Sequence, residues 1–420
     1  MKKDVAILCQ YFYPEYISSA TLPTELAIGL QQRGLSVGVV TGYPKNYVKS
    51  NLDKVLMNEK YKDVTIHRVK YTTLNNKTKV GRIVNFFTFF IAVLLKVFFL
   101  RRFKTIIVYS NPPILPIIPY YMKKMFGTKF IFVVFDIYPD SALKSNSIKV
   151  NGLIHKIMNF INHRTYKKAD KIILLGNEMK EYVIQEELAV TEKNLAVIPN
   201  WYSNEEYIAT DEIANYEYLH LREQFSFIIL YSGNMGTFQD METIQYALFH
   251  FRNQTDILFV FCGHGNKVEN LKEFIKENEI PNVKVYGFLI DSSYADVLKI
   301  SDICIVSLAK GTEGLGVPSK TYGYLAAGKP VIAIMDNHTD IAKSIITANC
   351  GRSILQGDHE RLITVINNYR NSHDIRKTHS TNAKNLYLST YSKEKGIEKY
   401  LHEIESVVTT TDGSEKYVHE

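Results

Sequence analysis

Four apolar runs in the second half of the chain each lead directly into a loop that carries glycine. The runs span residues 225–231, 258–262, 283–286 and 303–306. Short apolar runs that each end at a glycine turn are typical of buried parallel strands joined by helices. Parallel strands end at the same edge of their sheet, so the glycine loops are expected to meet there, where such domains bind ligands. The pattern therefore predicts a doubly wound α/β domain with one binding edge.

The first half of the chain begins with the same order of elements. An apolar strand at 5–8 is followed by a helical pattern through Leu22, Leu26 and Leu30, and then by a second strand at 37–41. A chain of 420 residues, 46% of them hydrophobic, has room for two cores. The expected fold class is α/β, with two Rossmann-like doubly wound domains. The expected divisions are a first domain at 1–199, a linker at 200–224, a second domain at 225–377, C-terminal helices at 378–408 that can cross back to the first domain, and a frayed tail at 409–420.

The stretch from Glu313 to Ile332 reads EGLGVPSKTYGYLAAGKPVI and is the most specific part of the sequence. A glycine-rich loop is followed by Ser319 as a helix cap, a short helix at 321–327 and Gly328 as its end. Free N–H groups at a helix start, with Lys320 beside them, favour an anion. Two interpretations stay open: a loop that holds a diphosphate, or an ordinary connection in an α/β domain. The loop residues are Gly314, Leu315 and Gly316.

Charge is distributed unequally along the chain. Residues 1–200 carry 29 Lys and Arg against 14 Asp and Glu, a net charge of +15, whereas residues 201–420 carry 21 against 29, a net charge of −8. A basic half favours either nucleic acid or an anionic membrane surface. The stretch from Val84 to Leu100, VNFFTFFIAVLLKVFFL, lies between basic clusters and favours the membrane. Nucleic-acid binding is not expected, because the basic half carries no nucleic-acid motif.

Three structures are open for the stretch from Val84 to Leu100: a helix in the membrane interface, a core helix, or a transmembrane span. Its 17 residues include Asn85 and Lys96, and a span needs about 20 apolar residues, so the interfacial helix is preferred. Residues 114–125 form either a second membrane-facing piece or a buried helix. No signal peptide opens the chain, and we expect a peripheral protein on the cytoplasmic face of the membrane.

A predicted strand at 130–135 ends at Asp136, which is either a functional carboxylate or the cap of the next turn. The lone loop histidine, His264, is likewise open between a structural and a binding role. No Asp-x-Asp, His-x-x-x-His or Cys-x-x-Cys pair occurs, so neither a metal nor another cofactor is expected. The four cysteines lie in or beside apolar runs and fit a reducing cytoplasm.

Several motifs together resemble the family 4 glycosyltransferases, which are retaining enzymes of the GT-B fold. The second half matches through YSGNMG (231–236), VFCGHGNKVENL (260–271), NVKVYGF (282–288), SDICIVSL (301–308) and GLGVPSKTYGYLAAGKPVIA (314–333). The first half matches more weakly, through YPE-x-x-SSA (13–20), SNPP (110–113) and DIYPDS (136–141). The pattern is similar to the bacterial subgroup that makes O-antigen, capsule or related polysaccharide, which includes N-acetylfucosamine-type transferases.

The resemblance implies that the second domain binds a nucleotide-sugar and that the first domain binds the acceptor, across a central cleft. Lys320 would neutralise the diphosphate, and Glu313 would lie near the sugar. The implied donor-binding residues are Gly233, Asn234, Gly263, His264, Gly287, Phe288, Gly314, Leu315, Gly316, Ser319 and Lys320. The implied acceptor-side residues are Ser18, Ser19 and Asp136. The implied catalytic residues are Asp136, Glu313 and Lys320, with no metal.

The sequence departs from the family pattern at two acidic positions. The family carries two glutamates separated by seven residues in the 314–333 block, and their places fall at Leu315 and Gly323. Glu313 lies two residues from the first place and can compensate for it. The second glutamate usually holds the ribose, and what replaces it at Gly323 is left open.

The expected function is a membrane-associated, metal-independent, retaining glycosyltransferase. It would move an N-acetylhexosamine from a UDP-sugar to a polyprenyl-diphosphate-linked glycan in capsule or O-antigen synthesis. One alternative is a non-catalytic glycosyltransferase-like subunit, which the missing glutamates favour. A second alternative is a UDP-sugar epimerase of similar architecture, although the sequence lacks the acidic and histidine pairs expected of one.

Overall fold

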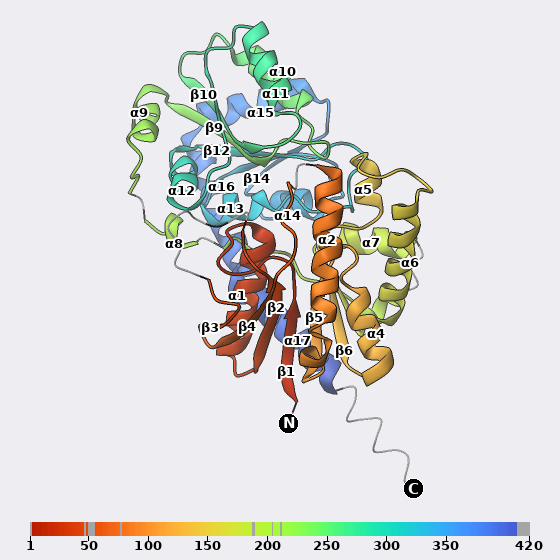
Figure 1. Ribbon diagram of the computed structural model, residues 1–420. Helices are drawn as coiled ribbons and strands as arrows, with labels where there is room; N and C mark the ends of the chain where they lie inside the picture. Colours follow the sequence, from red (N-terminus) through yellow and green to blue (C-terminus); the bar gives the residue numbers. More distant parts are fainter. Residues whose placement is uncertain are drawn as a thin grey trace. The chain divides into compact units, whose positions relative to one another are not determined.

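The computed structural model describes residues 2–45, 48, 55–75, 78–186, 190–203, 205–210 and 212–409. The chain divides into two compact units, each built on its own parallel sheet (Figure 1). Unit 1 comprises Met1–Pro199 and Lys393–Glu420, and unit 2 comprises Asn200–Ser392. The tail predicted from residue 409 lies, from residue 410 onward, outside the described residues.

Unit 1 contains an eight-stranded sheet in the order β3-β4-β2-β1-β5-β6-β7-β8. Its strands are β1 (Lys3–Leu8), β2 (Val37–Gly42), β3 (Asn58–Tyr61), β4 (Val64–Val69), β5 (Phe103–Tyr109), β6 (Lys129–Val134), β7 (Lys171–Leu174) and β8 (Leu195–Val197). Only β3 pairs antiparallel, with β4. The central strands are mostly apolar beyond their first residues because helices cover both faces of such a sheet. Strand order reverses between β1 and β5, which places a ligand crevice at their carboxyl ends.

Helices connect the strands of unit 1, and one further helix returns to it from the C-terminal end of the described chain. They are α1 (Ser18–Gln32), α2 (Lys79–Leu94), α3 (Val97–Leu100), α4 (Ile117–Phe126), α5 (Asp140–Lys144), α6 (Leu153–Lys168), α7 (Asn177–Gln185) and α17 (Lys393–Thr409). The last of these, α17, packs on α1, and a Cβ at Gly29 would lie only 2.3 Å from the Ile397 side chain. The C-terminal helix therefore belongs to unit 1 although it follows unit 2 in the sequence.

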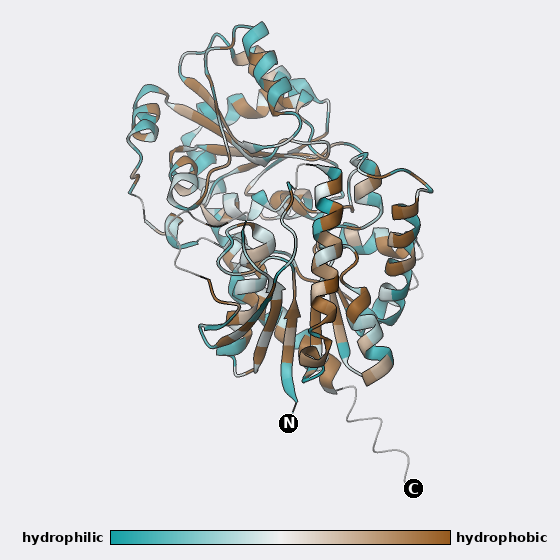
Figure 2. Ribbon diagram, in the orientation of Figure 1, coloured by the Kyte–Doolittle hydropathy of each residue, from teal (hydrophilic) through white to brown (hydrophobic). Residues whose placement is uncertain are grey.

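The apolar stretch from Val84 to Leu100 forms α2 and α3, separated by Leu95 and Lys96. Phe89 and Val93 are buried on one face of α2, where the buried Asn85 accepts from the Leu74 N–H and donates to the Leu74 carbonyl. The opposite face of α2 carries exposed apolar side chains. Figure 2 shows hydrophobic colour over much of this helix, interrupted by paler and hydrophilic bands. No helix among the described residues is long and apolar enough to cross a membrane.

Unit 2 contains a six-stranded parallel sheet in the order β11-β10-β9-β12-β13-β14. Its strands are β9 (Phe227–Asn234), β10 (Ile257–His264), β11 (Val283–Tyr286), β12 (Ile303–Ser307), β13 (Val331–Ile334) and β14 (Gly351–Ile354). Its helices are α8 (Glu205–Ile208), α9 (Tyr216–Gln224), α10 (Glu242–Phe251), α11 (Val268–Glu277), α12 (Asp291–Ile300), α13 (Lys320–Ala326), α14 (Asp340–Thr347), α15 (His359–Asn371) and α16 (His373–Leu386). One hydrophobic cluster fills each side of the sheet. Strand order reverses between β9 and β12.

Two structural boundaries differ from those expected from the sequence. Residues 200–224, expected as a linker, include α9, whose Tyr218 and Leu221 lie in the core of unit 2. Two buried side chains on an otherwise polar helix give too weak a pattern to be seen in the sequence. The expected C-terminal segment 378–408 is divided between the units, since α16 lies in unit 2 and α17 in unit 1.

Candidate active site

Strands β9 and β12 stop pairing before their carboxyl ends, at the point where the strand order of unit 2 reverses. A doubly wound sheet forms its ligand crevice at such a point. The two strands pair only at Ile229 with Ile303 and at Leu230 with Cys304. Beyond these pairs, Tyr324 of α13 takes the place of the β12 backbone and accepts a hydrogen bond from the Ser232 N–H at 2.7 Å. The loop after β9 and the loop after β12 therefore line the crevice expected in doubly wound domains.

Glycines bring the loops after β9 and β10 into direct contact. Gly263 is paired with Gly233, and the N–H of Met235 donates to the His264 carbonyl at 2.7 Å. A Cβ on Gly263 would lie 1.9 Å from the Gly233 carbonyl oxygen, and Gly263 has a positive φ of 144°. The backbone of this edge is therefore closely packed, and only glycine fits at Gly263.

Replacing Gly263 with alanine is expected to lower the free energy of unfolding by about 3 kcal/mol or more, because a methyl group cannot enter this backbone contact. Gly287→Ala is the matched control, since no atom lies within 4 Å of its Cβ position. That substitution should change stability by less than about 0.5 kcal/mol. Urea denaturation of both variants measures the difference, and equal midpoints would contradict the packing described here.

Lys320, the first residue of α13, extends over the end of β9. Its Nζ lies 3.8 Å from the centre of the Tyr231 ring and donates to the Asn234 carbonyl at 3.2 Å. Its Cε is 3.3 Å from the position of a Cβ on Gly233. Within the described part of the chain, no carboxylate lies within ion-pair distance of this ammonium group. Removal from water lowers the pKa of Lys320 to about 7.

A partly buried ammonium group without a counter-ion is a strong anion-binding feature. Burying the charge is unfavourable on its own, and an anion that completes the pair recovers that free energy. Asn234 and Gly233, at the end of β9, lie beside this ammonium group. The crevice of unit 2 is therefore suited to a phosphate-bearing ligand.

The loop before α13 only partly matches its sequence-based description. Ser319 occupies the cap position, but its side chain makes no capping hydrogen bond, so the prediction of Ser319 as a side-chain cap is wrong. The N–H groups of Ser319, Thr321 and Tyr322 donate within the turn, to Val317, Pro318 and Ser319 respectively. These N–H groups are already satisfied, so the Lys320 side chain is the main anion-binding group of this loop.

The other residues expected in the glycine-rich loop have different surroundings. Glu313 is half-buried and accepts a hydrogen bond from the Gln356 amide at 3.3 Å. Gly314 has a positive φ of 78°, which a glycine adopts without strain, and Gly316 is half-buried. Leu315 is 6% exposed, so the first missing glutamate is replaced by a side chain that packs inside the unit.

Two tyrosines occupy the space where the second missing glutamate would begin. A Cβ on Gly323 would lie 3.3 Å from both the Tyr202 ring and the Tyr294 hydroxyl. Tyr294 in turn lies 3.0 Å from the Ser232 hydroxyl, at the end of β9. The Tyr202 hydroxyl is buried without a partner among the described residues. The Tyr294 hydroxyl therefore supplies a polar atom at this position, beside the Tyr202 ring.

His264 and Phe288 form an exposed aromatic pair at the ends of neighbouring strands. Their ring centres are 5.4 Å apart in an edge-to-face arrangement, and Phe288 is 49% exposed. The Gly263 N–H donates to the Gly287 carbonyl at 3.0 Å, which holds the two loops together. Exposed aromatic rings beside an anion site provide a surface on which a planar base can stack.

Asp136 lies at the carboxyl edge of unit 1, just after β6. Its backbone N–H and that of Phe135 both approach the Ser110 hydroxyl, at 3.3 and 3.0 Å. Its carboxylate has no hydrogen-bond or ion-pair partner among the described residues, and burial raises its pKa to about 6. Ser18 and Ser19 begin α1, where Ser18 is exposed and Ser19 half-buried. No hydrogen bond joins these serines to Asp136 in the described part of the chain.

Sequence reasoning did not identify other polar residues at this edge. Glu15, within the YPE-x-x-SSA motif, is 4% exposed, and burial raises its pKa to about 8. Gln10 and Asn111 follow β1 and β5, and each has a buried side-chain oxygen without a partner among the described residues. Strands β1 and β5 flank the reversal of strand order in unit 1. A position just after either strand could therefore have indicated a binding-site residue from the sequence.

A group of three or more His, Cys, Asp or Glu side chains able to hold a metal ion is not found among the described residues. His264, which was open to a metal-binding role, lies against Phe288.

The match to known families falls on unit 2. Residues 221–386 match the family model described as glycosyl transferases group 1. This chain carries a group 1 glycosyltransferase domain. The domain includes the crevice, Lys320 and the four glycine loops described above, and the predicted resemblance to family 4 glycosyltransferases is confirmed.

Two curated proteins are similar to this chain over longer stretches. The probable glycosyltransferase WbjE of Pseudomonas aeruginosa is 24% identical over 267 residues, 63% of this chain and 66% of that protein. The match thus spans just under two thirds of the length of WbjE. The putative colanic acid biosynthesis glycosyl transferase WcaI of Escherichia coli K12 is 20% identical over 344 residues, 79% of this chain and 83% of that protein.

Solved structures share the fold of the whole chain. Sucrose-phosphate synthase of Thermosynechococcus elongatus has a TM-score of 0.71 and 14% identity over 97% of this chain and all of that chain. Anabaena HepE in complex with UDP has a TM-score of 0.70 and 13% identity over 96% of this chain and all of that chain. The predicted fold class, GT-B with two Rossmann-like α/β domains, is confirmed.

Proposed function

We propose that this chain is a retaining, metal-independent glycosyltransferase. It moves a sugar, an N-acetylhexosamine, from a UDP-sugar to a polyprenyl-diphosphate-linked glycan in the synthesis of a capsule or O-antigen. The observation that carries the proposal is the uncompensated ammonium group of Lys320 in the crevice of a group 1 glycosyltransferase domain. The similarity to WcaI and to the UDP complex of HepE supports the pathway class and the nucleotide.

In the proposed mechanism, unit 2 stabilises the leaving nucleoside diphosphate. Lys320 and the dipoles around Asn234 face the oxygens on which negative charge develops when the bond between sugar and phosphate breaks. The uracil stacks on the aromatic pair of His264 and Phe288. The ring of Tyr202 lies beside Gly323, and its hydroxyl, which has no partner among the described residues, takes over the ribose contact that the family glutamate makes elsewhere.

The acceptor hydroxyl attacks from the face that the diphosphate leaves, which retains the configuration of the sugar. The leaving diphosphate oxygen accepts the acceptor's proton, so the reaction needs no strong protein base. Asp136 orients the acceptor hydroxyl and stabilises the developing positive charge on the sugar. Its pKa of about 6 leaves the carboxylate ionised at neutral pH.

The membrane helps to deliver the acceptor. The exposed apolar face of α2 and α3 rests in the cytoplasmic leaflet, and the surrounding lysines and arginines bind anionic headgroups. A lipid-linked acceptor is then concentrated at the same surface as the enzyme. Flotation with anionic liposomes tests this attachment, and no binding at low salt would contradict it.

A second candidate, a non-catalytic glycosyltransferase-like subunit, is favoured by the two missing glutamates. The place of the first is filled by the buried Leu315, and the place of the second is closed by tyrosine rings. Such a subunit would bind UDP but release none from any UDP-sugar. Calorimetric titration of UDP, together with an assay of UDP release, separates the two candidates.

The affinity for UDP is expected to fall as the pH rises from about 7 to about 9. The pKa of Lys320 is lowered to about 7, so the free protein loses the positive charge in this range, and the diphosphate binds the charged form. The fall approaches about tenfold per pH unit above the pKa of the free protein. Lys320→Arg should remove most of the slope, because arginine stays charged. A slope that is the same in the two proteins would show that another group titrates.

A further inference from the structure

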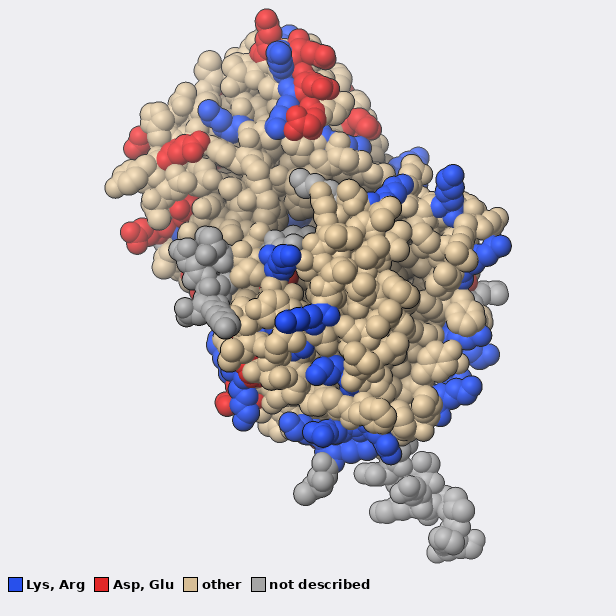
Figure 3. All heavy atoms as spheres, in the orientation of Figure 1, with Lys and Arg blue, Asp and Glu red and all other residues tan. Residues whose placement is uncertain are grey.

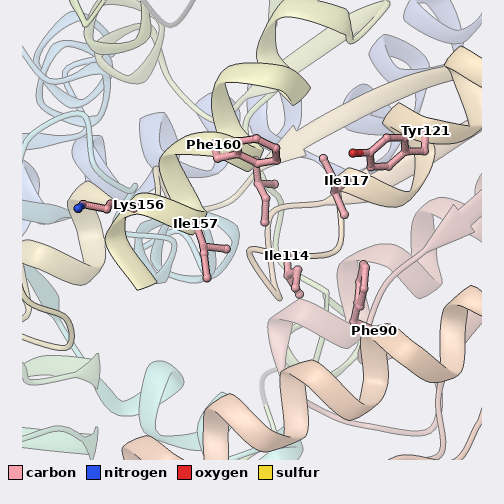
Figure 4. A pocket seen from close by; sticks show the side chains of 8 residues that line it. Phe90, Ile114, Ile117, Tyr121, Lys156, Ile157 and Phe160 are labelled. Carbon is pink, nitrogen blue, oxygen red and sulfur yellow. The ribbon is translucent and has the colours of Figure 1, made fainter. Parts of the chain in front are cut away.

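The helices α2, α4 and α6 of unit 1 enclose a groove of about 500 Å³. Phe90 of α2 lies on one side of the hollow, and Ile157 and Phe160 of α6 lie on the other (Figure 4). Ile114 and Ile117 close it from the segment that begins α4. The lining is thus almost wholly apolar, although the groove is open to the surface. An apolar groove of this size matches the volume of small-molecule sites, but it offers few groups that could orient a polar ligand.

The groove continues into a wider exposed apolar surface on the same three helices. The exposed residues of α2 recur at helical spacing, opposite its buried face, and are Val80, Ile83, Phe87, Ile91 and Leu94. On α4 and α6, Met125 is 67% exposed and Leu153 is 75% exposed. Monomeric proteins rarely expose so many large apolar side chains together, so this surface is expected to meet an apolar environment.

The charge of the surface indicates which apolar environment it meets. Helices α2, α3, α4 and α6 contain no Asp or Glu, whereas α2, α4 and α6 each carry Lys or Arg. Figure 3 shows this face of unit 1 with an uncharged area bordered by blue side chains. The guanidinium carbon of Arg164 lies 3.4 Å from the centre of the Phe160 ring, and the side chain of Lys156 points away from the hollow (Figure 4). Cations around an apolar face complement an anionic lipid bilayer.

We propose that the groove between α2, α4 and α6 receives a hydrocarbon chain of an anionic membrane lipid. With the lipid chain bound in the groove, α6 and α2 both form part of one membrane-binding surface. This inference deepens the proposed membrane attachment, which concerns only α2 and α3, and it therefore rests on the proposed function. The side chain of Ile157 or Phe160 contacts the lipid chain, and nearby basic side chains contact the headgroup.

The test measures binding of the full-length protein to vesicles of phosphatidylglycerol and phosphatidylethanolamine in equal parts. Ile157→Asp is expected to weaken binding roughly tenfold or more, because it places a carboxylate in the apolar groove. Asn159→Asp is the matched control, since it adds the same charge to an exposed position of α6 outside the groove. It should weaken binding by no more than about twofold to fivefold. Equal losses in the two variants would overturn the inference.

A second measurement does not depend on the folding of an aspartate variant. Phe160→Trp places a fluorophore at the groove, and lipids brominated on their acyl chains should quench it once the protein is bound. If the variant binds the vesicles but the fluorescence of the introduced tryptophan is not quenched, the inference is overturned. Binding that requires polyprenyl phosphate in the vesicles would also overturn it, because the occupant would then be the acceptor lipid. UDP binding by each variant reports separately on unit 2, so loss of the proposed donor function would be recognised as a different failure.

Discussion

Replacing Lys320 with alanine is expected to weaken UDP binding roughly 30- to 150-fold. The side chain supplies a charge-assisted contact worth about 2–3 kcal/mol to a diphosphate, and the described residues place no other ammonium or guanidinium group over the end of β9. Because the same charge stabilises the leaving group, kcat/KM for the donor should fall further, by about 100- to 1,000-fold.

Two further variants separate the charge of Lys320 from its packing. Lys320→Met keeps a long apolar stem against the Tyr231 ring but removes the charge, and it should lose as much affinity as the alanine variant. Lys343→Ala removes an exposed lysine from α14 and should leave the affinity unchanged. Titration calorimetry measures all three. Wild-type affinity in Lys320→Met would show that the side chain contributes packing alone.

Replacing Asp136 with asparagine is expected to lower kcat by about 100-fold or more while leaving the affinity for UDP unchanged. The reason is that Asp136 belongs to unit 1, whereas the proposed donor site lies in unit 2. In the wild-type protein, kcat should also fall below about pH 6, as protonation removes the charge of the carboxylate.

Stability provides an independent readout for the same substitution. The raised pKa of Asp136 means that the folded state disfavours the ionised carboxylate. Ionisation therefore lowers the free energy of unfolding as the pH rises from the pKa of the unfolded chain to the folded-state pKa of about 6. Asp136→Asn should therefore be at least as stable as the wild type at neutral pH. Asp63→Asn, at an exposed turn, is the control and should retain full activity. A variant that loses stability but keeps its activity would indicate a structural role for Asp136.

Apolar strands were the part of the fold most readily predicted from the sequence. Strands buried on both faces, such as β9 and β10, appear as continuous apolar runs and were located closely. The hairpin of β3 and β4 was missed because β3 is polar and lies at the sheet edge. Strand β14 was also missed. It too lies at a sheet edge, and its sequence GRSI does not alternate clearly between apolar and polar residues. The pattern of apolar and polar residues predicts a strand only where the strand is buried, because burial is what requires apolar side chains.

The candidate site was predictable where it depends on local sequence and not where it depends on tertiary packing. The glycine loops and Lys320 follow strands that the sequence identifies. By contrast, Tyr202 and Tyr294 meet at Gly323 from distant parts of unit 2, and no spacing rule predicts that contact. The burial of Glu15 likewise depends on the surrounding fold rather than on its neighbours in sequence.

The most direct test of the proposed function is UDP release by the purified protein across a panel of UDP- and GDP-sugars, with and without a lipid-linked acceptor fraction. The proposal predicts release from one UDP-sugar, increased by the acceptor, unaffected by EDTA and lost in Lys320→Ala. Absence of release from every sugar, with UDP still bound, would contradict it and identify a non-catalytic subunit.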